Sequence, residues 1–339
     1  MNETPAAPLL EVKDLRVSFQ VLRGVTRSLI QAVRGVSFSL EKGNVLGIVG
    51  ESGSGKSVTT QALPGLLPAS ASVSGSVKYD GRELLGLGVE GMREYRGKKI
   101  GMIFQEPGRS YDPLQNMAGV FFETLRNSDP VISREEALAK AETLLAETGL
   151  PNGRERLVNF PHQFSGGQLQ RIGIALALAQ NCELLIADEP TTALDVTIQK
   201  QIVELLKELR KSRQISIIFI SHDIDLVADI SDRIMVMYGG MVMESADSEV
   251  IASSPRHPYT KSLVAASPRF GSHYSRERLV PIPGKVTDPA RPEPGCPFAP
   301  RCAQARGECD AAIPELKPAG NAAGNSAHTI RCVFNGNGL

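Results

Sequence analysis

A glycine-rich stretch that follows a short apolar run limits the possible folds of this chain more than any other feature of its sequence. Residues 45–49 are Val-Leu-Gly-Ile-Val, and residues 50–57 are Gly-Glu-Ser-Gly-Ser-Gly-Lys-Ser. The apolar run has the length of a buried strand. The second segment fits the pattern G-x-x-x-x-G-K-[ST], in which glycines let backbone N–H groups surround a phosphate. The sequence therefore predicts a strand, a phosphate-binding loop and a helix within an α/β fold.

Each position of this loop has an expected role. The glycines permit the tight backbone turns, and a helix beginning near Lys56 adds the positive end of its dipole. Lys56 is expected to reach the β- and γ-phosphates of a nucleotide, and the Ser57 hydroxyl to bind Mg²⁺. A chance glycine-rich turn is the alternative, with a frequency of about one in a hundred chains of this length. The predicted nucleotide-binding residues are Gly50, Ser52, Gly53, Ser54, Gly55, Lys56, Ser57 and Val58.

Composition excludes several classes of protein. The 339 residues carry 37 lysines and arginines against 37 aspartates and glutamates, so no overall positive charge indicates a nucleic-acid partner. The longest strand-like apolar run, residues 215–220, is far too short to cross a bilayer, and residues 1–8 lack the features of a signal peptide. We therefore expect a cytoplasmic protein that reaches a membrane only through a partner. In that reducing compartment its five cysteines are expected to be free, metal-bound or redox-active.

Strand patterns surround the phosphate loop. Alternating residues at 10–19 and 32–40, separated by a variable loop, predict an antiparallel layer placed before the phosphate loop. Residues 73–79 and 99–104 are further predicted strands.

The pattern then becomes helical, from about residue 117 to 181. The segment Ser133-Arg-Glu-Glu136 fits a capping box that opens a helix, and Gly149 and Pro151 are expected to end that helix. A helical subdomain inserted between strands is therefore predicted.

Strand signals resume after the helical region. Continuous apolar runs at 183–187 and 215–220 predict parallel strands buried on both faces, joined by a helix at 196–212. The pair Gly239-Gly240 predicts a hairpin between residues 233 and 244. The alternation of strands and helices places the chain in the α/β class with a mixed sheet.

Polar residues follow three of the predicted strands. Asp188 ends an apolar strand, which is where phosphate-loop enzymes need the carboxylate that holds Mg²⁺. Glu189 comes next and is placed to act as a general base toward the attacking water. His222 is expected to contact the γ-phosphate or this water, and Gln105 to contact Mg²⁺ or the water. Solvated carboxylates, a structural histidine and an ordinary loop glutamine are the alternatives.

The segment Phe164-Ser-Gly-Gly-Gln168 is the most specific feature of the chain. Ser165 is a suitable N-cap, and Gly166 and Gly167 leave amides exposed at the start of a helix. This makes a second anion-binding site that no strand precedes. Two phosphate-binding ends in different subdomains predict a dimer that closes over nucleotide.

Together these motifs resemble those of ABC ATPases, over about residues 9 to 255 and in the family's order. The resemblance implies ATP and Mg²⁺ as ligands and a head-to-tail dimer, in which each ATP lies between the phosphate loop of one subunit and the signature motif of the other. By position Phe19 resembles the aromatic residue that stacks on adenine, with a buried strand aromatic as the alternative. The corresponding motifs are Gly50 to Ser57 (Walker A), Gln105 (Q-loop), Ser165, Gly166, Gly167 and Gln168 (signature), Leu184 to Glu189 (Walker B), Ala193 to Asp195 (D-loop) and His222 (switch histidine).

Three further segments, residues 188–199, 257–260 and 295–302, resemble the ATPases of oligopeptide and dipeptide importers. This resemblance implies an ATP-hydrolysing subunit at the cytoplasmic face of the inner membrane. It also implies pairing with a second, related ATPase under two membrane permeases that an extracytoplasmic binding protein supplies. Family members carry peptides, but also nickel, glutathione, opines and some sugars. A soluble ABC ATPase that acts on ribosomes or DNA is the rival class.

The predicted organisation has two parts. Residues 1–255 form an ABC-type P-loop NTPase domain with a mixed sheet core, an antiparallel β subdomain and a helical subdomain at about 106–180. Residues 256–339 form an extension of the oligopeptide-transporter type, which is irregular from residue 268 onward and rich in proline and glycine.

The extension contains Cys296, Cys302, Cys309 and Cys332, with the spacing C-x5-C-x6-C-x22-C. Four thiolates in an irregular segment suit tetrahedral zinc or an iron–sulfur cluster, and the paired C-x-x-C spacing of zinc ribbons is absent from this sequence. The resemblance favours a [4Fe–4S] cluster, with zinc or free thiols as alternatives. Cys182 is expected to be a small buried hydrophobe.

Overall fold

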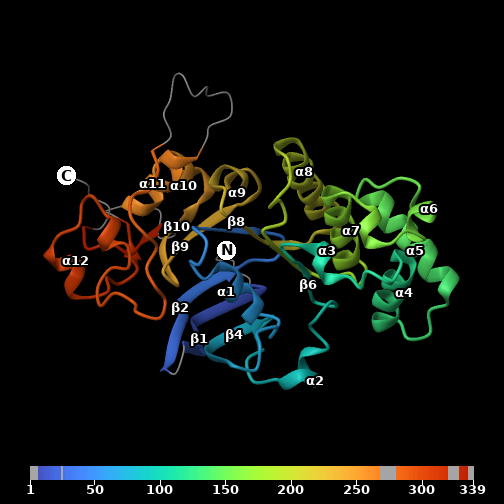
Figure 1. Ribbon diagram of the computed structural model, residues 1–339, viewed down its shortest axis with the longest axis horizontal. Helices are drawn as coiled ribbons and strands as arrows, with labels where there is room; N and C mark the ends of the chain where they lie inside the picture. The colour runs from blue at the N-terminus through green and yellow to red at the C-terminus, as the bar shows by residue number, and fades with distance from the viewer. Residues whose placement is uncertain (1–6, 24–25, 268–279, 320–327, 335–339) are drawn as a thin grey trace, which may run out of the picture. The chain divides into compact units, whose positions relative to one another are not determined.

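A computed structural model describes residues 7–23, 26–267, 280–319 and 328–334 of the chain (Figure 1). The chain divides into two compact units: residues 1–87 with 219–339, and residues 88–218. Two expectations concern residues outside the described ranges. They are the irregular structure at 268–279, 320–327 and 335–339, and the absence of a signal peptide at residues 1–6.

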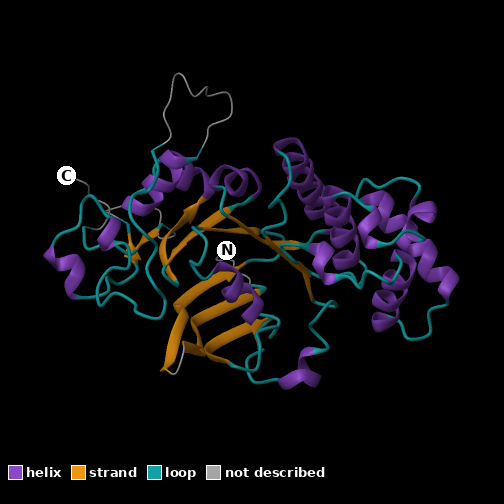
Figure 2. Cartoon of the chain, in the orientation of Figure 1, coloured by secondary structure: helices purple, strands orange, loops and turns teal. Residues whose placement is uncertain are grey.

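The first unit contains an antiparallel four-stranded sheet in the order β2-β1-β4-β5, seen as a layer of strands in Figure 2. The long strands β1 and β2 pair from Leu10 opposite Leu40 to Arg23 opposite Thr26. The variable loop expected between residues 19 and 32 is therefore mostly strand, because β1 and β2 continue to pair with each other through that segment. The strands are β1 (Leu10–Arg23), β2 (Thr26–Leu40), β4 (Ala71–Tyr79) and β5 (Arg82–Glu83).

A second sheet in this unit has the order β11-β12-β10-β9-β3. Strand β3 pairs with β9 in parallel, and β9 pairs with β10 through the predicted hairpin, in which Gly239 and Gly240 both have positive φ. The strands are β3 (Val45–Val49), β9 (Arg233–Tyr238), β10 (Met241–Asp247), β11 (Lys317–Pro318) and β12 (Thr329–Ile330).

Short helices cover these sheets. Helix α1 contacts β1 and β2, and α9 lies on β3 at Gly47, where a Cβ atom would collide with Val227. The extension is not wholly irregular, because its strand β12 pairs with Glu244 and Ser245 of β10. The helices are α1 (Lys56–Ala62), α9 (Ile224–Ile230), α10 (Ser248–Ser253), α11 (Pro258–Ala266), α12 (Gly307–Ala311) and the 3₁₀ turn η2 (Ala299–Arg301).

The second unit combines two parallel strands, β6 (Ile100–Ile103) and β7 (Leu184–Asp188), with a group of helices. The predicted capping box is present at Ser133 and Glu136, and helix α5 ends before Gly149, whose φ is +75°. Its helices are α2 (Gly88–Met92), α3 (Pro107–Ser110), α4 (Met117–Ser128), α5 (Arg134–Glu147), α6 (Gly153–Leu157), the 3₁₀ turn η1 (Pro161–Gln163), α7 (Gly166–Leu178) and α8 (Val196–Arg213).

Burial follows the predicted strand pattern. Every residue of β3, of β7 and of β8 (Ser216–Ser221) is buried, as expected for parallel strands covered on both faces. In the helical region, Leu125, Ile132 and Ala137 form a core cluster with Phe122 and Ala179.

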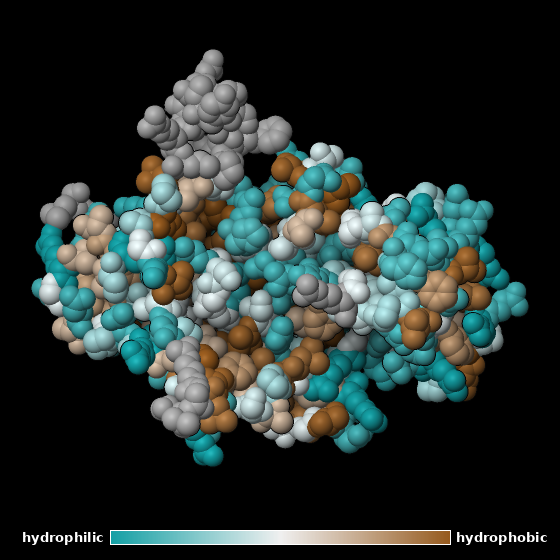
Figure 3. Space-filling model, viewed as in Figure 1, coloured by the Kyte–Doolittle hydropathy of each residue, from teal (hydrophilic) through white to brown (hydrophobic). Residues whose placement is uncertain are grey.

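Within the described ranges, no helix combines the length and the apolar character needed to cross a bilayer. On the face in view, polar residues are interspersed with apolar ones over the helices (Figure 3).

Candidate functional site

The phosphate loop connects β3 to α1 and is fixed by close backbone contacts. A Cβ atom on Gly50 would collide with the carbonyl oxygen of Met237 on β9. Gly55 has φ +99°, and a Cβ there would lie 2.5 Å from the carbonyl oxygen of Ala32. A residue with a Cβ atom would collide with the backbone at either position, and at Gly55 it would also have to adopt a strained positive φ, so both positions need glycine. The loop is thus shaped by β2 and β9 as well as by its own sequence.

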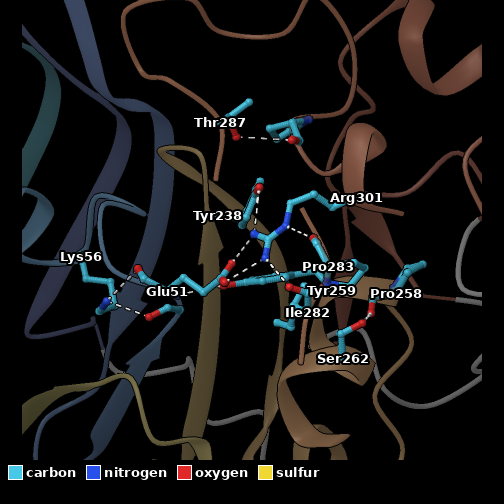
Figure 4. A network of polar contacts seen from close by, with 12 residues as sticks. Glu51, Lys56, Tyr238, Pro258, Tyr259, Ser262, Ile282, Pro283, Thr287 and Arg301 are labelled. Carbon is cyan, nitrogen blue, oxygen red and sulfur yellow. Dashed lines mark hydrogen bonds and ion pairs between the residues drawn. The ribbon is translucent and has the colours of Figure 1, made fainter. Parts of the chain in front are cut away.

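Lys56 begins α1 and is almost fully buried, with 4% of its surface exposed. Its Nζ donates hydrogen bonds to the carbonyl oxygens of Gly50 (2.8 Å) and Glu51 (3.1 Å), so the loop closes around its own lysine (Figure 4). Ser54 is also buried, whereas Ser52 and Gly53 at the tip of the loop are exposed. The charged amine therefore lies within the loop, where the motif requires it.

The Glu51 side chain binds the C-terminal extension. The Arg301 guanidinium donates to both Glu51 carboxylate oxygens, from Nη1 at 2.6 Å and from Nη2 at 3.0 Å. It also donates to the Tyr238 hydroxyl, and to the carbonyl oxygens of Ile282 and Pro283. The hydrogen bond to Glu51 is the main reason why the pKa of Arg301 is raised above its ordinary value.

Aromatic rings surround this ion pair. The rings of Tyr238, Tyr259 and Phe298 are fully buried and lie 4.7–5.4 Å apart between centroids. The backbone N–H of Glu51 donates to the Tyr259 hydroxyl at 2.9 Å, and burial raises the pKa of that phenol. Sequence reasoning did not find this cluster, because its members lie in four separate segments and no local pattern connects them.

A second buried polar group holds the start of α11. Nδ1 of His257 accepts a hydrogen bond from the backbone N–H of Tyr259, and burial lowers the pKa of His257 to about 4. Glu244 on β10 accepts from the N–H of His257 and from Nε2 of His328. Burial acts to raise the pKa of Glu244, but these hydrogen bonds outweigh it and the pKa lies below its ordinary value.

In the second unit, β7 ends at the predicted acidic pair. Asp188 is 3% exposed, and Glu189 has φ +47°, an uncommon conformation for a residue other than glycine. Oε2 of Glu189 accepts from the Thr192 hydroxyl at 2.8 Å and from Nε2 of Gln105 at 3.0 Å. The structure therefore brings the predicted Gln105 and Glu189 together.

Two further predicted site residues, besides those of the phosphate loop, belong to the first unit. His222 directly follows β8 and is exposed. Phe19 lies on β1 opposite Ile30 and is half-buried. Its place in the antiparallel sheet suits both a strand aromatic and a ring that offers one face to a base.

The signature segment begins α7 in the second unit. The Ser165 hydroxyl accepts from the Gln168 backbone N–H, and the Gln168 side chain accepts from the Ser165 N–H, which completes a capping box. Ser165 and Gly166 are exposed. These residues line a hollow of about 590 Å³ together with Asp195, whose carboxylate caps α8 through the N–H of Ile198. The four signature residues and Asp195 are therefore neighbours.

The four cysteines of the extension do not fit the predicted cluster. All four lie in the described ranges, where no group of three or more Cys, His, Asp or Glu side chains is arranged to hold a metal ion. The prediction of a [4Fe–4S] cluster is therefore not supported. Cys182 is buried beside Gly101, as expected.

Solved structures of similar fold define the class of protein. A dimeric structure of the ATP-binding cassette MJ0796 bound to ADP and Pi matches 70% of this chain and 98% of its own, with a TM-score of 0.61 and 29% identity. A second dimeric structure of MJ0796, described as a bacterial ABC transporter cassette, matches with a TM-score of 0.62 and 28% identity over the same shares. The fold and the phosphate loop are those of an ABC ATPase cassette.

Sequence comparison goes further. Residues 33–192 match the ABC transporter family, and residues 243–309 match the family described as oligopeptide/dipeptide transporter, C-terminal region. The chain is 48% identical to the oligopeptide transport ATP-binding protein OppD of Bacillus subtilis (strain 168), over 88% of this chain and 82% of that protein. It is 43% identical to the dipeptide transport ATP-binding protein DppD of the same organism, over 96% and 94%. The chain belongs to the ABC transporter family, among its ATP-binding proteins.

Proposed function

We propose that this chain is the ATP-binding and ATP-hydrolysing subunit of an importer for peptides or related small solutes. The observation that carries the proposal is the presence of a phosphate loop and a signature segment in one chain whose relatives are named oligopeptide and dipeptide transport ATP-binding proteins. The matched C-terminal region supports peptides as the cargo.

Each motif then has a proposed role. The loop from Gly50 to Val58 binds the ATP phosphates through Lys56 and backbone amides, and Phe19 stacks on adenine. Mg²⁺ is held by Ser57, Gln105 and Asp188.

Hydrolysis requires a base and a partner for the γ-phosphate. Glu189 accepts a proton from the attacking water, and its hydrogen bond from Gln105 orients the carboxylate. His222 contacts the γ-phosphate. Ser165 to Gln168, with Asp195, complete the ATP site of a second subunit, in line with the dimeric cassettes of similar fold. The proposal gives no role to an iron–sulfur cluster, because the cysteines do not fit one.

The proposed assembly is a pair of ABC ATPases under two membrane permeases, at the cytoplasmic face of the inner membrane, with an extracytoplasmic solute-binding protein that delivers cargo. A second, related ATPase chain is the proposed partner, so that the pair is a heterodimer. The proposed domain division keeps residues 1–255 as the ATPase domain and 256–339 as the extension.

Purification of the tagged full-length chain from membranes of its own organism tests this assembly. We expect two integral membrane proteins and a second ATPase to copurify, and ATP hydrolysis to depend on Mg²⁺. Recovery of ribosomal proteins or DNA in their place would support the rival class of ABC ATPases. The cargo is tested by measuring which ligands the partner binding protein retains, with peptides expected and nickel, glutathione, opines or sugars as the competing outcomes.

A further inference from the structure

Arg301 is fully engaged by its neighbours. A guanidinium has five N–H donors, and five donor–acceptor contacts join this one to Glu51, Tyr238, Ile282 and Pro283. The side chain is only 3% exposed, and its partner Glu51 is 25% exposed. A buried arginine with this many acceptors has a fixed position. It therefore holds the carboxylate of Glu51 in one place, as Figure 4 shows.

Glu51 occupies one of the four variable positions of the phosphate loop, directly after Gly50. Its carboxylate brings a negative charge to a loop whose ligand is itself strongly negative. At short range and away from bulk water, like charges repel strongly. A cation that pairs with this carboxylate lowers the repulsion toward a polyphosphate, and Arg301 is the cation that pairs with it.

The extension also contacts the loop backbone. The Glu51 N–H donates to the hydroxyl of Tyr259, whose ring packs on Phe298 three residues before Arg301. The carbonyl of the same residue accepts from Lys56. The side chain, the N–H and the C=O of Glu51 are thus all fixed, and two of these three contacts come from residues beyond 255.

We infer that Arg301 of the C-terminal extension is a positioning residue of the ATP site, which neutralises Glu51 and fixes the phosphate loop so that the extension sets the affinity of this chain for ATP. The inference rests on the proposed function, since it assumes that the loop binds ATP.

A charge-neutralising role makes a distinctive prediction for a double-mutant cycle. Arg301→Gln leaves the Glu51 carboxylate unpaired beside the phosphates, and we expect the Kd for ATP to rise about tenfold. In a Glu51→Gln background the same substitution leaves no unpaired charge, and we expect a change of less than about twofold. A merely structural role predicts similar losses in both backgrounds.

The experiment measures binding of a fluorescent ATP analogue and the kcat and KM of ATP hydrolysis in the full chain. Arg331→Gln is the matched control, because Arg331 also lies in the extension and donates to the carbonyls of Val242 and Pro314, away from the phosphate loop. We expect the Arg301→Gln variant to raise KM while kcat changes little, and its defect to shrink as salt is added. The control variant should bind ATP like the wild type.

Arg301→Lys replaces Arg301→Gln if the latter does not fold. It keeps the charge with three donors in place of five, and we expect about a threefold rise in Kd that the Glu51→Gln background removes. Wild-type affinity in the Arg301 variants, or an equal loss in both backgrounds, would overturn the inference. Failure of the wild-type chain to bind ATP, or equal binding by wild type and Lys56→Ala, would instead contradict the proposed function.

Discussion

The phosphate loop and the signature turn are both glycine-rich turns that open a helix, but they are stabilised in opposite ways. The phosphate loop is held by residues far away in the sequence: Ala32, Met237, Tyr259 and Arg301 all contact it. The turn at Ser165 is held by its own capping box, four residues long, and its first residues are exposed.

This difference agrees with what each turn is proposed to bind. A buried loop with its lysine already in place is prepared to receive phosphate within one chain. An exposed helix start with bare amides offers hydrogen bonds that only a group from outside can use. Under the proposed function, the first turn receives the phosphates of ATP in its own chain, whereas the second contributes to the ATP site of another subunit.

The largest expected effect is on ATP hydrolysis, in a variant that still binds ATP at the phosphate loop and the signature turn. Removing the general base in Glu189→Gln should lower ATP hydrolysis by about 10²–10⁴-fold while ATP binding is kept. Intact ATP can then occupy both turns at once, and we expect a dimer in ATP by size-exclusion chromatography. Glu183→Gln is the control, because Glu183 precedes the same strand at its other end and pairs with Lys99. Normal phosphate release from Glu189→Gln would exclude Glu189 as the base.

Lys56→Ala tests ATP binding by the phosphate loop directly. The variant loses a buried charge with two hydrogen bonds to the loop, and we expect the affinity for ATP to fall about 100-fold. Isothermal titration measures this, with Lys42→Ala, an exposed lysine in the turn before β3, as the control. Undiminished affinity would mean that the loop does not bind the nucleotide.

Acid should weaken the surroundings of the phosphate loop more than those of the signature turn. His257 has a folded pKa of about 4 against about 6.5 when unfolded, so the unfolded chain binds more protons between these values. Stability from this group is complete above pH 6.5 and is lost as the pH falls toward 4, amounting to about 2 kcal/mol by pH 5.

His257→Asn keeps an N-cap side chain without a titrating ring. Urea unfolding followed by circular dichroism at pH 7.5 and pH 5 should show a smaller loss of stability in this variant than in the wild type. Equal losses would show that His257 does not carry the acid sensitivity.

The smallest expected effect is on the stability of the signature turn at Ser165. Ser165→Ala removes an N-cap and should cost about 1 kcal/mol of stability, as should Ser133→Ala at the matching capping box of α5. Only Ser165→Ala should also lower ATP hydrolysis, while ATP binding by the single chain stays unchanged. Equal hydrolysis by the two variants would remove Ser165 from the ATP site.

Local sequence patterns predicted what depends on neighbours in the chain. The capping box at Ser133, the N-cap at Ser165, the Gly239-Gly240 hairpin and the buried strand before Gly50 are each specified within a few residues, and the structure contains all of them. Membership of the ABC transporter family followed from the order of such motifs.

Other features depend on pairing across long distances. The continuation of β1 and β2 past residue 19 is fixed by cross-strand packing, which a single strand pattern does not reveal. The Glu51–Arg301 pair joins residues 250 positions apart, and no pattern in either segment predicts that the two side chains meet. The resemblance to importer ATPases favoured a [4Fe–4S] cluster at the four cysteines, but neither resemblance nor spacing alone brings thiol groups into a metal's coordination geometry.

The 250-residue separation of Glu51 and Arg301 also has a consequence for biosynthesis. A ribosome makes the phosphate loop first, and the guanidinium that pairs with it is added only 250 residues later. Chains truncated before residue 301 carry an intact loop motif with an uncompensated carboxylate. If Arg301 positions the loop as we infer, a nascent chain acquires its nucleotide-binding form only after residue 301 has been made.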